Sequence, residues 1–243
     1  MSQLVKSPLT QEETTAWLRG LLALAWADGS FDESEKELID ALSHEELETD
    51  TDINKLEPIT PKELAIALGD DTMAENFLRT AVMVALADGV YSEPEDELLH
   101  DFCNAFGLKV EALDALRANL QQAKLEAEKG NMEGAIASAA GADISDLHPD
   151  HPDHPDHHGE ILGPVKDWLD GWDIHDPKVA HMVCKLVPPQ CPFERDIVIF
   201  GRKVAHIPAM CKLNPLYEQL VGLRFRALSY LADDCKEDIS KYY

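Results

Sequence analysis

Apolar residues recur every three or four positions along most of residues 1–130, a spacing typical of helices that bury one face. No run in this region alternates strictly between apolar and polar residues, as a half-buried strand would. We therefore expect residues 1–130 to be helical. The positions that carry the helical period are Leu38, Ile39, Leu42, Leu98, Leu99, Phe102, Leu113, Leu116 and Leu120.

Sequence signals for helix starts occur at intervals within this pattern. In a helix cap with Ser/Thr/Asp-x-x-Glu spacing, the first side chain accepts a hydrogen bond from a first-turn N–H group, and the glutamate accepts one in return. Gly29 follows the first expected helix, and glycine readily takes the left-handed conformation that ends a helix. Segments with this spacing begin at Thr10, Asp32, Thr60 and Ser92.

The segment Trp17–Leu38 is repeated, in altered form, as Phe77–Leu98. Identical residues coincide without a gap, which chance does not easily produce, so the pattern predicts a duplicated helix–loop–helix unit. The coinciding pairs include Leu18/Leu78, Arg19/Arg79, Ala27/Ala87, Asp28/Asp88, Gly29/Gly89, Glu33/Glu93, Glu35/Glu95, Glu37/Glu97 and Leu38/Leu98.

Residues 131–160 interrupt the helical pattern. From His148 to His158 a proline stands at every third position, which excludes a helix and favours the extended polyproline II conformation. We expect a semi-rigid linker rich in His, Pro and Asp.

Residues 161–243 are apolar again and predict a second, small helical domain. Asp176-Pro177 and Asn214-Pro215 each combine a cap with a first-turn proline, and Pro188-Pro189 stops the helix between them. The β-branched run Asp196–Ile199 has no evident partner strand, so we expect it to be helical or irregular.

The predicted fold is therefore all-α, with a duplicated domain at residues 1–130, a linker at 131–160 and a small helical domain at 161–243.

The acidic charge is confined to one part of the chain. The formal net charge is -25, from 21 Lys+Arg against 46 Asp+Glu. Residues 1–160 hold 35 of the acidic residues and 10 of the basic ones, and residues 161–243 hold 11 of each. A chain this acidic repels phosphate backbones, so we expect no nucleic-acid partner. The apolar runs are too short to cross a bilayer and the N-terminus lacks a signal-peptide core, so we expect a cytoplasmic protein without a transmembrane segment.

The loop between the helices of each repeat gathers carboxylates on a glycine-containing turn. Hard cations such as calcium bind several oxygen ligands on turns of this kind, although the loop is too short for an EF-hand. The alternative interpretation is a set of acidic caps that face the positive ends of the following helices. The residues concerned are Asp28, Asp32, Glu35, Asp88 and Glu95.

Both copies carry the motif Ala-Asp-Gly-x-Phe/Tyr-x-x-x-Glu between apolar helices. With this motif, about residues 11–125 resemble the tellurite-resistance TerB-like family. The resemblance implies an all-α domain of two similar halves, with a divalent cation, such as calcium, held by acidic residues between them. The matching positions are Asp28, Glu35, Asp88 and Glu95, and Ser92 stands where the first copy has Asp32, so the two sites are not equal.

The His-Pro-Asp tract offers a second possible metal site. Three residues per polyproline turn place one set of histidines along one edge, and imidazole suits zinc, nickel and copper. A hydrophilic linker is the alternative, because a solvated tract gives no preformed geometry. The histidines are His148, His151, His154 and His157.

Four of the five cysteines lie in residues 161–243. No two of the cysteines have Cys-x-x-Cys spacing, so zinc-ribbon and thioredoxin-like sites are excluded. Four cysteines can hold an iron–sulfur cluster, whereas free cysteine also behaves as a small buried hydrophobe. The candidates are Cys184, Cys191, Cys211 and Cys235; Cys103 is expected in the core.

The C-terminal region carries the segments Cys191-Pro-Phe-Glu-Arg-Asp196, Phe200-Gly-Arg202, His206-Ile-Pro208 and Cys211–Leu228. With these segments, about residues 163–243 resemble the cyanobacterial family known as the Mo-dependent nitrogenase C-terminal domain. The resemblance implies a cyanobacterial host and a link to nitrogen fixation, but the chain lacks the cluster cradle of a nitrogenase catalytic subunit.

No nucleophile–base pair, phosphate-binding loop or catalytic carboxylate pair is recognisable, which favours a protein that is not an enzyme. We expect a non-catalytic cytosolic adaptor or stress-related protein, with an acidic module that binds a divalent cation or a basic partner and a C-terminal module that docks onto a protein partner. The alternative is an iron–sulfur or other metal-carrying redox or accessory protein that uses the C-terminal cysteines.

Overall fold

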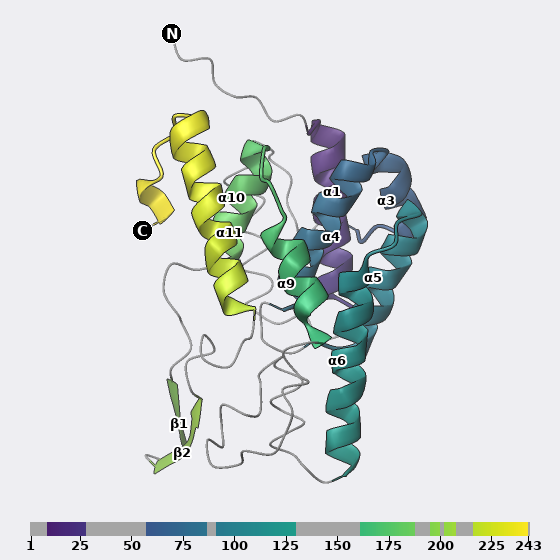
Figure 1. Cartoon of the computed structure of the whole chain (residues 1–243), viewed down its shortest axis with the longest axis vertical. Coiled ribbons are helices and arrows are strands. Elements are labelled where there is room, and N and C mark those ends of the chain that lie inside the picture. Colours follow the sequence, from purple (N-terminus) through teal and green to yellow (C-terminus); the bar gives the residue numbers. More distant parts are fainter. Residues whose placement is uncertain are drawn as a thin grey trace.

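The computed structural model of the chain describes residues 9–27, 57–86, 91–129, 161–187, 195–199, 202–207 and 216–242. Most of these residues are helical, which confirms the predicted all-α class (Figure 1). None of the described helices combines the length and the apolar character needed to cross a membrane. The helices are α1 Gln11–Ala25, α3 Pro61–Leu68, α4 Asp71–Ala85, α5 Glu93–Phe106, α6 Glu111–Glu128, α9 Gly163–Asp170, α10 Pro177–Leu186 and α11 Tyr217–Ser229, with a π-helical turn at Tyr230–Asp234 and a 3-10 turn at Ser240–Tyr242.

Local caps start the helices where the sequence predicts them. The capping boxes at Thr10, Thr60 and Ser92 are all present. The helix α10 begins after Asp176, whose Oδ1 accepts hydrogen bonds from the N–H groups of Lys178 at 2.7 Å and Val179 at 3.3 Å. The cap predicted at Asp32 lies outside the described residues.

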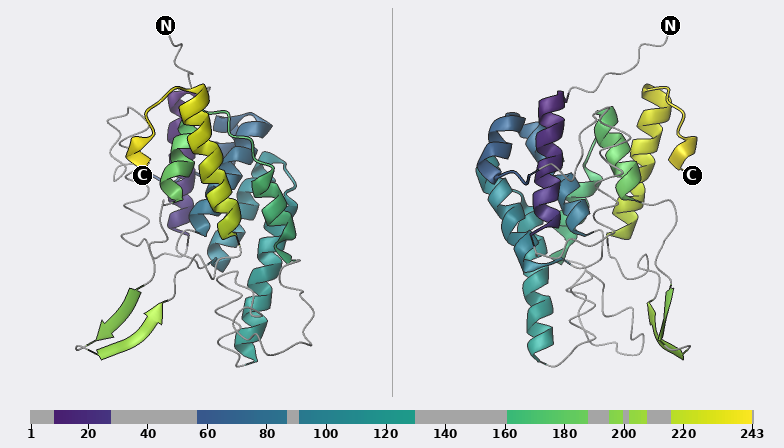
Figure 2. Two further views of the ribbon diagram at one scale, coloured as in Figure 1. Left: turned by 60° about the vertical axis from the view of Figure 1, so that its left-hand side comes forward. Right: turned by 180° about the vertical axis from the view of Figure 1, so that it is seen from behind.

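Two predictions for the C-terminal region need correction. The helix expected to start at Asn214-Pro215 starts at Tyr217, without a side-chain cap. The expectation of a helical or irregular Asp196–Ile199 is wrong, because strand β1 (Arg195–Ile199) pairs antiparallel with β2 (Arg202–Ile207). The partner strand follows after only two residues, and the Gly201 in that connection is the hairpin signal that the sequence offered. Figure 2 shows this hairpin apart from the helices.

The first helices of the two sequence repeats form matching elements. The helices α1 and α4 have 15 residues each and begin at equivalent positions of the repeat. The equivalent residues Trp17 and Phe77 meet edge to face, with ring centroids 5.6 Å apart, and Phe77 packs on Phe102 in the same way at 5.2 Å. The second helix expected in the first copy lies outside the described part, so duplication of the complete unit stays a prediction.

One hydrophobic core runs through the helices before and after the predicted linker. The helix α9 packs beside α6, and α10 contacts α4. The Nζ of Lys178 on α10 also donates to the Leu9 carbonyl oxygen at 3.2 Å and to Thr14 Oγ1 at 3.1 Å, at the start of α1. Figure 2 shows α10 between α1 and α11. The described parts of the two predicted domains therefore pack closely together.

The close contact between α1 and α4 requires a glycine. A Cβ on Gly20 would lie 2.7 Å from Cζ of Phe77 and 3.0 Å from Cδ2 of Leu64, both of which are fully buried. We expect Gly20→Ala to lower the free energy of unfolding by about 1–3 kcal/mol, because the added methyl group overpacks the core. Urea unfolding followed by circular dichroism measures this change.

The matched control is Gly222→Ala inside α11, where a Cβ meets only Arg226 Nη1, at an ordinary contact distance of 3.6 Å. Alanine favours a helix over glycine, so this variant should be neutral or more stable by up to about 1 kcal/mol. Equal losses in the two variants would contradict the overpacking argument.

Candidate functional site

The structure describes one of the predicted acidic ligands. Asp28, Asp32, Glu35 and Asp88 lie outside the described residues. Glu95 is 8% exposed, and its Oε2 accepts a hydrogen bond from the Ser92 N–H at 2.8 Å. Its carboxylate thus completes the capping box of α5. This is the cap role that the sequence allows as the alternative to cation binding.

The neighbouring Asp96 is the centre of a polar network that sequence reasoning missed. Its Oδ1 accepts a hydrogen bond from the Tyr91 hydroxyl at 3.0 Å, and its Oδ2 accepts one from Nε of Arg117 at 2.6 Å. Burial, with the charge of Asp96, raises the pKa of the Tyr91 phenol. Nε2 of His100 lies 3.6 Å from Oδ1 of Asp114 on α6. The network joins α5 to α6, and both carboxylate oxygens of Asp96 have hydrogen-bond partners, so we interpret it as a structural connection.

The described cysteines are core residues. Cys184 and Cys235 are buried, and burial raises the pKa of the Cys235 thiol. Cys191, Cys211 and the His148–His157 tract lie outside the described residues. Within the part of the chain that the structure describes, no group of three or more His, Cys, Asp or Glu side chains is placed to hold a metal ion.

A buried arginine holds the C-terminal segment against α10. The guanidinium of Arg224 donates to the carbonyl oxygens of Cys184, Val187 and Tyr242. On the same side, the His181 ring is hydrogen-bonded to the Tyr242 hydroxyl through Nδ1, and its Nε2 lies 2.8 Å from Glu237 Oε2. These contacts hold the 3-10 turn Ser240–Tyr242 against the core.

A pocket of about 490 Å³ lies at the junction of the regions before and after the linker. Small-molecule sites commonly have volumes of this order. Its buried wall is apolar and aromatic, whereas its exposed wall is acidic. The lining residues come from the start of α1, from α4 and from the segment that enters α10: Leu9, Trp17, Asp70, Thr72, Met73, Asn76, Arg79, Trp172, Asp173, His175, Asp176 and Val179.

Three residues of this lining carry buried N–H groups without a hydrogen-bond partner among the described residues. They are the indole Nε1 of Trp17, the indole Nε1 of Trp172 and the Nε of Arg79. Both tryptophans are only 1% exposed. Buried donors are normally paired, so these three groups are exceptions; each is covered by other atoms in the core beside the pocket and does not open onto the cavity.

Arg79 is enclosed by aromatic rings. Its guanidinium carbon lies 5.1 Å from the Trp168 ring centroid and 5.7 Å from that of Trp172. Its Nη2 lies 2.7 Å from Glu75 Oε1, which also accepts a hydrogen bond from Trp168 Nε1 at 3.0 Å. Burial lowers the pKa of the Arg79 guanidinium, an effect that the charge of Glu75 opposes. The cluster joins α4 to the C-terminal region, and Glu75 compensates the buried charge of Arg79.

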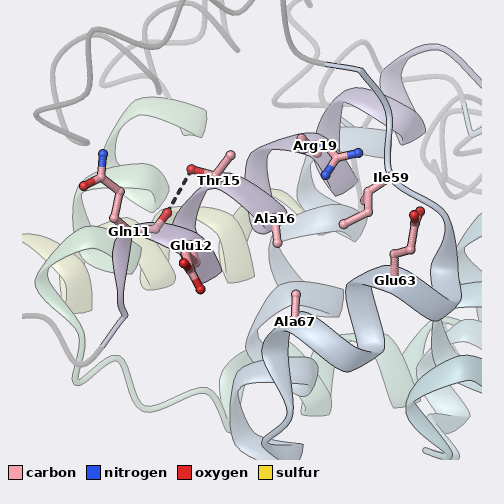
Figure 3. A pocket seen from close by; sticks show the side chains of 8 residues that line it. All are labelled: Gln11, Glu12, Thr15, Ala16, Arg19, Ile59, Glu63 and Ala67. Atoms are coloured by element: carbon pink, nitrogen blue, oxygen red, sulfur yellow. Dashed lines mark hydrogen bonds between the residues drawn. The ribbon is translucent and has the colours of Figure 1, made fainter.

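A second pocket, of about 440 Å³, lies between α1 and α3 (Figure 3). It contains Arg19, the repeat equivalent of Arg79. Arg19 donates through Nε to the Glu57 carbonyl oxygen at 2.7 Å and through Nη2 to the Pro58 carbonyl oxygen at 3.4 Å. The carboxylate of Glu63 accepts the cap hydrogen bonds of Thr60, which lower the pKa of Glu63. The main polar groups of this second pocket therefore already have hydrogen-bond partners. The junction pocket is the stronger candidate site.

We predict that Cys103, Cys184 and Cys235 resist alkylation while the protein is folded. Each is buried, and the raised thiol pKa values of Cys103 and Cys235 reduce the reactive thiolate fraction. Iodoacetamide near neutral pH, read by peptide mass spectrometry, should modify them on the order of a hundredfold more slowly than in urea-unfolded protein. Fast modification of Cys235 in the folded protein would instead indicate an accessible thiolate of the kind that a redox site needs.

The comparisons with known proteins bear on the C-terminal region. No curated protein and no solved structure matches the chain. The resemblance of residues 11–125 to the TerB-like family stays a prediction. Residues 161–243, which include the segment that closes the junction pocket, match the family model described as Mo-dependent nitrogenase C-terminus.

Proposed function

We propose that the protein is a non-catalytic adaptor that binds a protein partner through the outer side of α11. The observation that carries this proposal is an apolar stripe along that helix, formed by Tyr217, Val221 and Phe225. Tyr217 is 39% exposed and Phe225 is 69% exposed, and Val221 between them is partly exposed. Residues at this spacing lie on one side of a helix, which is how helices commonly present anchors to a partner.

The chemistry around the stripe favours a basic partner. The exposed Glu218 lies next to Tyr217. Residues 161–243 are balanced in charge, but the acidic excess of residues 1–160 gives the chain a net charge of -25 and so a long-range attraction for a basic surface. Opposite charges speed encounter and discourage wrong partners, while buried aromatic side chains supply most of the affinity. The partner surface we propose is therefore an apolar patch flanked by Lys or Arg. The stripe lies within residues 161–243, the part that matches the family model described as Mo-dependent nitrogenase C-terminus.

The test compares two variants that each remove one exposed apolar side chain. Phe225→Ser alters the stripe, whereas Ile66→Ser alters an 82% exposed residue of α3 on the other side of the bundle (Figure 1). In affinity purification of the full tagged chain from its host, Phe225→Ser should reduce recovery of the specific partner by about tenfold, as loss of a binding hot spot does. Ile66→Ser should retain that recovery, and added salt should weaken the association.

Unchanged recovery with Phe225→Ser would contradict docking at α11. Light scattering after size-exclusion chromatography provides the second arm. A wild-type dimer that becomes monomeric in Phe225→Ser would show that the stripe binds a second copy of the chain, which also contradicts the proposal.

The acidic loops add a separate element to this proposal, a divalent cation held by Asp28, Glu35, Asp88 and Glu95. Because Glu95 already caps α5, we assign the main ligands to the other positions. Calcium should raise the melting temperature of the full chain, since a ligand that binds only the folded state stabilises it. The double variant Asp28→Asn/Asp88→Asn should lose most of this shift, whereas Asp71→Asn, in the first turn of α4, should keep it. An unchanged melting temperature of the wild type with calcium would remove the cation from the proposal.

A further inference from the structure

The middle of α11 contains a glycine, Gly222, that the packing of the described chain does not require. A glycine inside a helix makes the helix less stable than an alanine would. Gly20 in α1 has a packing reason for this loss, because a Cβ there would lie 2.7 Å from Cζ of Phe77. A Cβ on Gly222 would meet only Nη1 of Arg226 among the described residues, at an ordinary contact distance of 3.6 Å. The reason for Gly222 therefore has to be sought outside the described packing.

The contacts of α11 show which way Gly222 faces. Arg226 donates to a backbone carbonyl oxygen of α9, and Arg224 donates to one of α10. These two arginines mark the sides of α11 that contact its neighbours. Helical geometry places Gly222, Phe225 and Ser229, at positions i, i+3 and i+7, together on the side that faces away from both. In Figure 1, α11 lies at the front of the bundle and no described helix covers it.

The outer side of α11 has a shape that a second helix fits. Phe225 is 69% exposed and projects from it, whereas Gly222 has no side chain and the exposed Ser229 has a small one. The side chains at a contact set the distance between packed helices, so a glycine lets two helix axes approach closely. Phe225 then fits between the side chains of the second helix. An extended peptide instead binds by adding to a sheet edge, which a helix does not offer.

Acidic residues flank this surface. Glu218 lies one helical turn before Gly222, Asp233 lies about one turn after Ser229, and both are exposed. The guanidinium of Arg226 is directed toward α9 and donates to the Leu169 carbonyl oxygen at 2.9 Å. Lys or Arg side chains beside the apolar face of a second helix would meet these carboxylates. Charge pairs at the rim of an interface fix orientation and partner choice more than affinity.

We propose that the partner docks on α11 as an amphipathic helix, which crosses α11 over Gly222 and packs around Phe225. Its Lys or Arg side chains face Glu218 and Asp233. This inference rests on the docking role proposed above and specifies the partner element as a helix. It adds Gly222 to the binding surface, although Gly222 contributes no apolar side chain.

The test uses a variant that should change folding and binding in opposite directions. Glutamine favours a helix more than glycine does, so Gly222→Gln should keep or raise the melting temperature of the full chain. Its side chain would also hold a second helix away from α11. The partner is the protein whose recovery with the full tagged chain depends on Phe225, and Gly222→Gln should reduce that recovery by about tenfold. Ala118→Gln, which adds the same side chain at an exposed position of α6, should leave it unchanged.

Two synthetic peptides of the same Leu, Ala and Lys composition test the helix directly. In one peptide Leu recurs every three or four positions, as in an amphipathic helix, and in the other Leu occupies every second position, as in a strand. Fluorescence anisotropy with the full chain, at about 0.15 M salt to screen distant charges, measures both affinities. The helical peptide should bind at least about tenfold more tightly. Gly222→Gln and Phe225→Ser should each remove most of this preference, and Ala118→Gln should retain it.

The outcomes separate this inference from the docking role itself. A loss of partner recovery with Phe225→Ser but not with Gly222→Gln would overturn the crossing helix and leave docking at α11 intact. Unchanged recovery with both variants would remove the docking role as well. Equal affinity for the two peptides, or equal binding to all variants, would indicate attraction to the acidic chain as a whole and would contradict the helix. A lower melting temperature in Gly222→Gln would show that Gly222 serves the fold, which also contradicts the proposal.

Discussion

The guanidinium of Arg79, which faces the rings of Trp168 and Trp172, joins α4 to the region after the predicted linker. The charge is largely buried, so it depends on its neighbours: Glu75 compensates it, the two rings face it, and Trp168 is in turn hydrogen-bonded to Glu75. Removing one member would leave a buried charge or donor without its partner, which costs more than the contact itself contributes. The junction pocket lies beside this cluster and exists because α4 and the C-terminal region are held together there.

Much of the fold could be predicted because helix signals are local. A capping box needs only four residues, so Thr10, Thr60 and Ser92 identify helix starts without knowledge of the tertiary structure. The hairpin was missed for the opposite reason. A strand is stable only with a partner, and the run Asp196–Ile199 does not itself show that Arg202–Ile207 will pair with it.

The candidate site was less predictable, because residue type does not determine a side chain's surroundings. A buried hydrophobe and a cluster ligand are both written as cysteine. Cys184 and Cys235 are buried in the core, and Cys191 and Cys211 lie outside the described residues, so the shared cysteine site stays a prediction. Glu95 fitted a cap and a cation ligand equally well, and its hydrogen bond to Ser92 supports the cap. Trp17 and Trp172 come from distant parts of the chain, so no local pattern could indicate that they line one cavity.

The repeat shows how one residue type acquires different roles through its packing partners. Arg19 and Arg79 occupy equivalent positions on two helices of equal length. Arg19 faces the segment that leads into α3, whose backbone carbonyl oxygens accept its hydrogen bonds. Arg79 faces the C-terminal region, whose described residues cover it with aromatic rings and supply no backbone acceptor for its Nε. Indole rings exclude water but do not replace its hydrogen bonds to the guanidinium. Arg19 therefore connects two backbone segments in the first repeat, whereas Arg79 in the second repeat keeps an Nε–H group without an acceptor among the described residues. The C-terminal region therefore creates the pocket by the way it covers α4, and a repeat unit without that cover would have no such site.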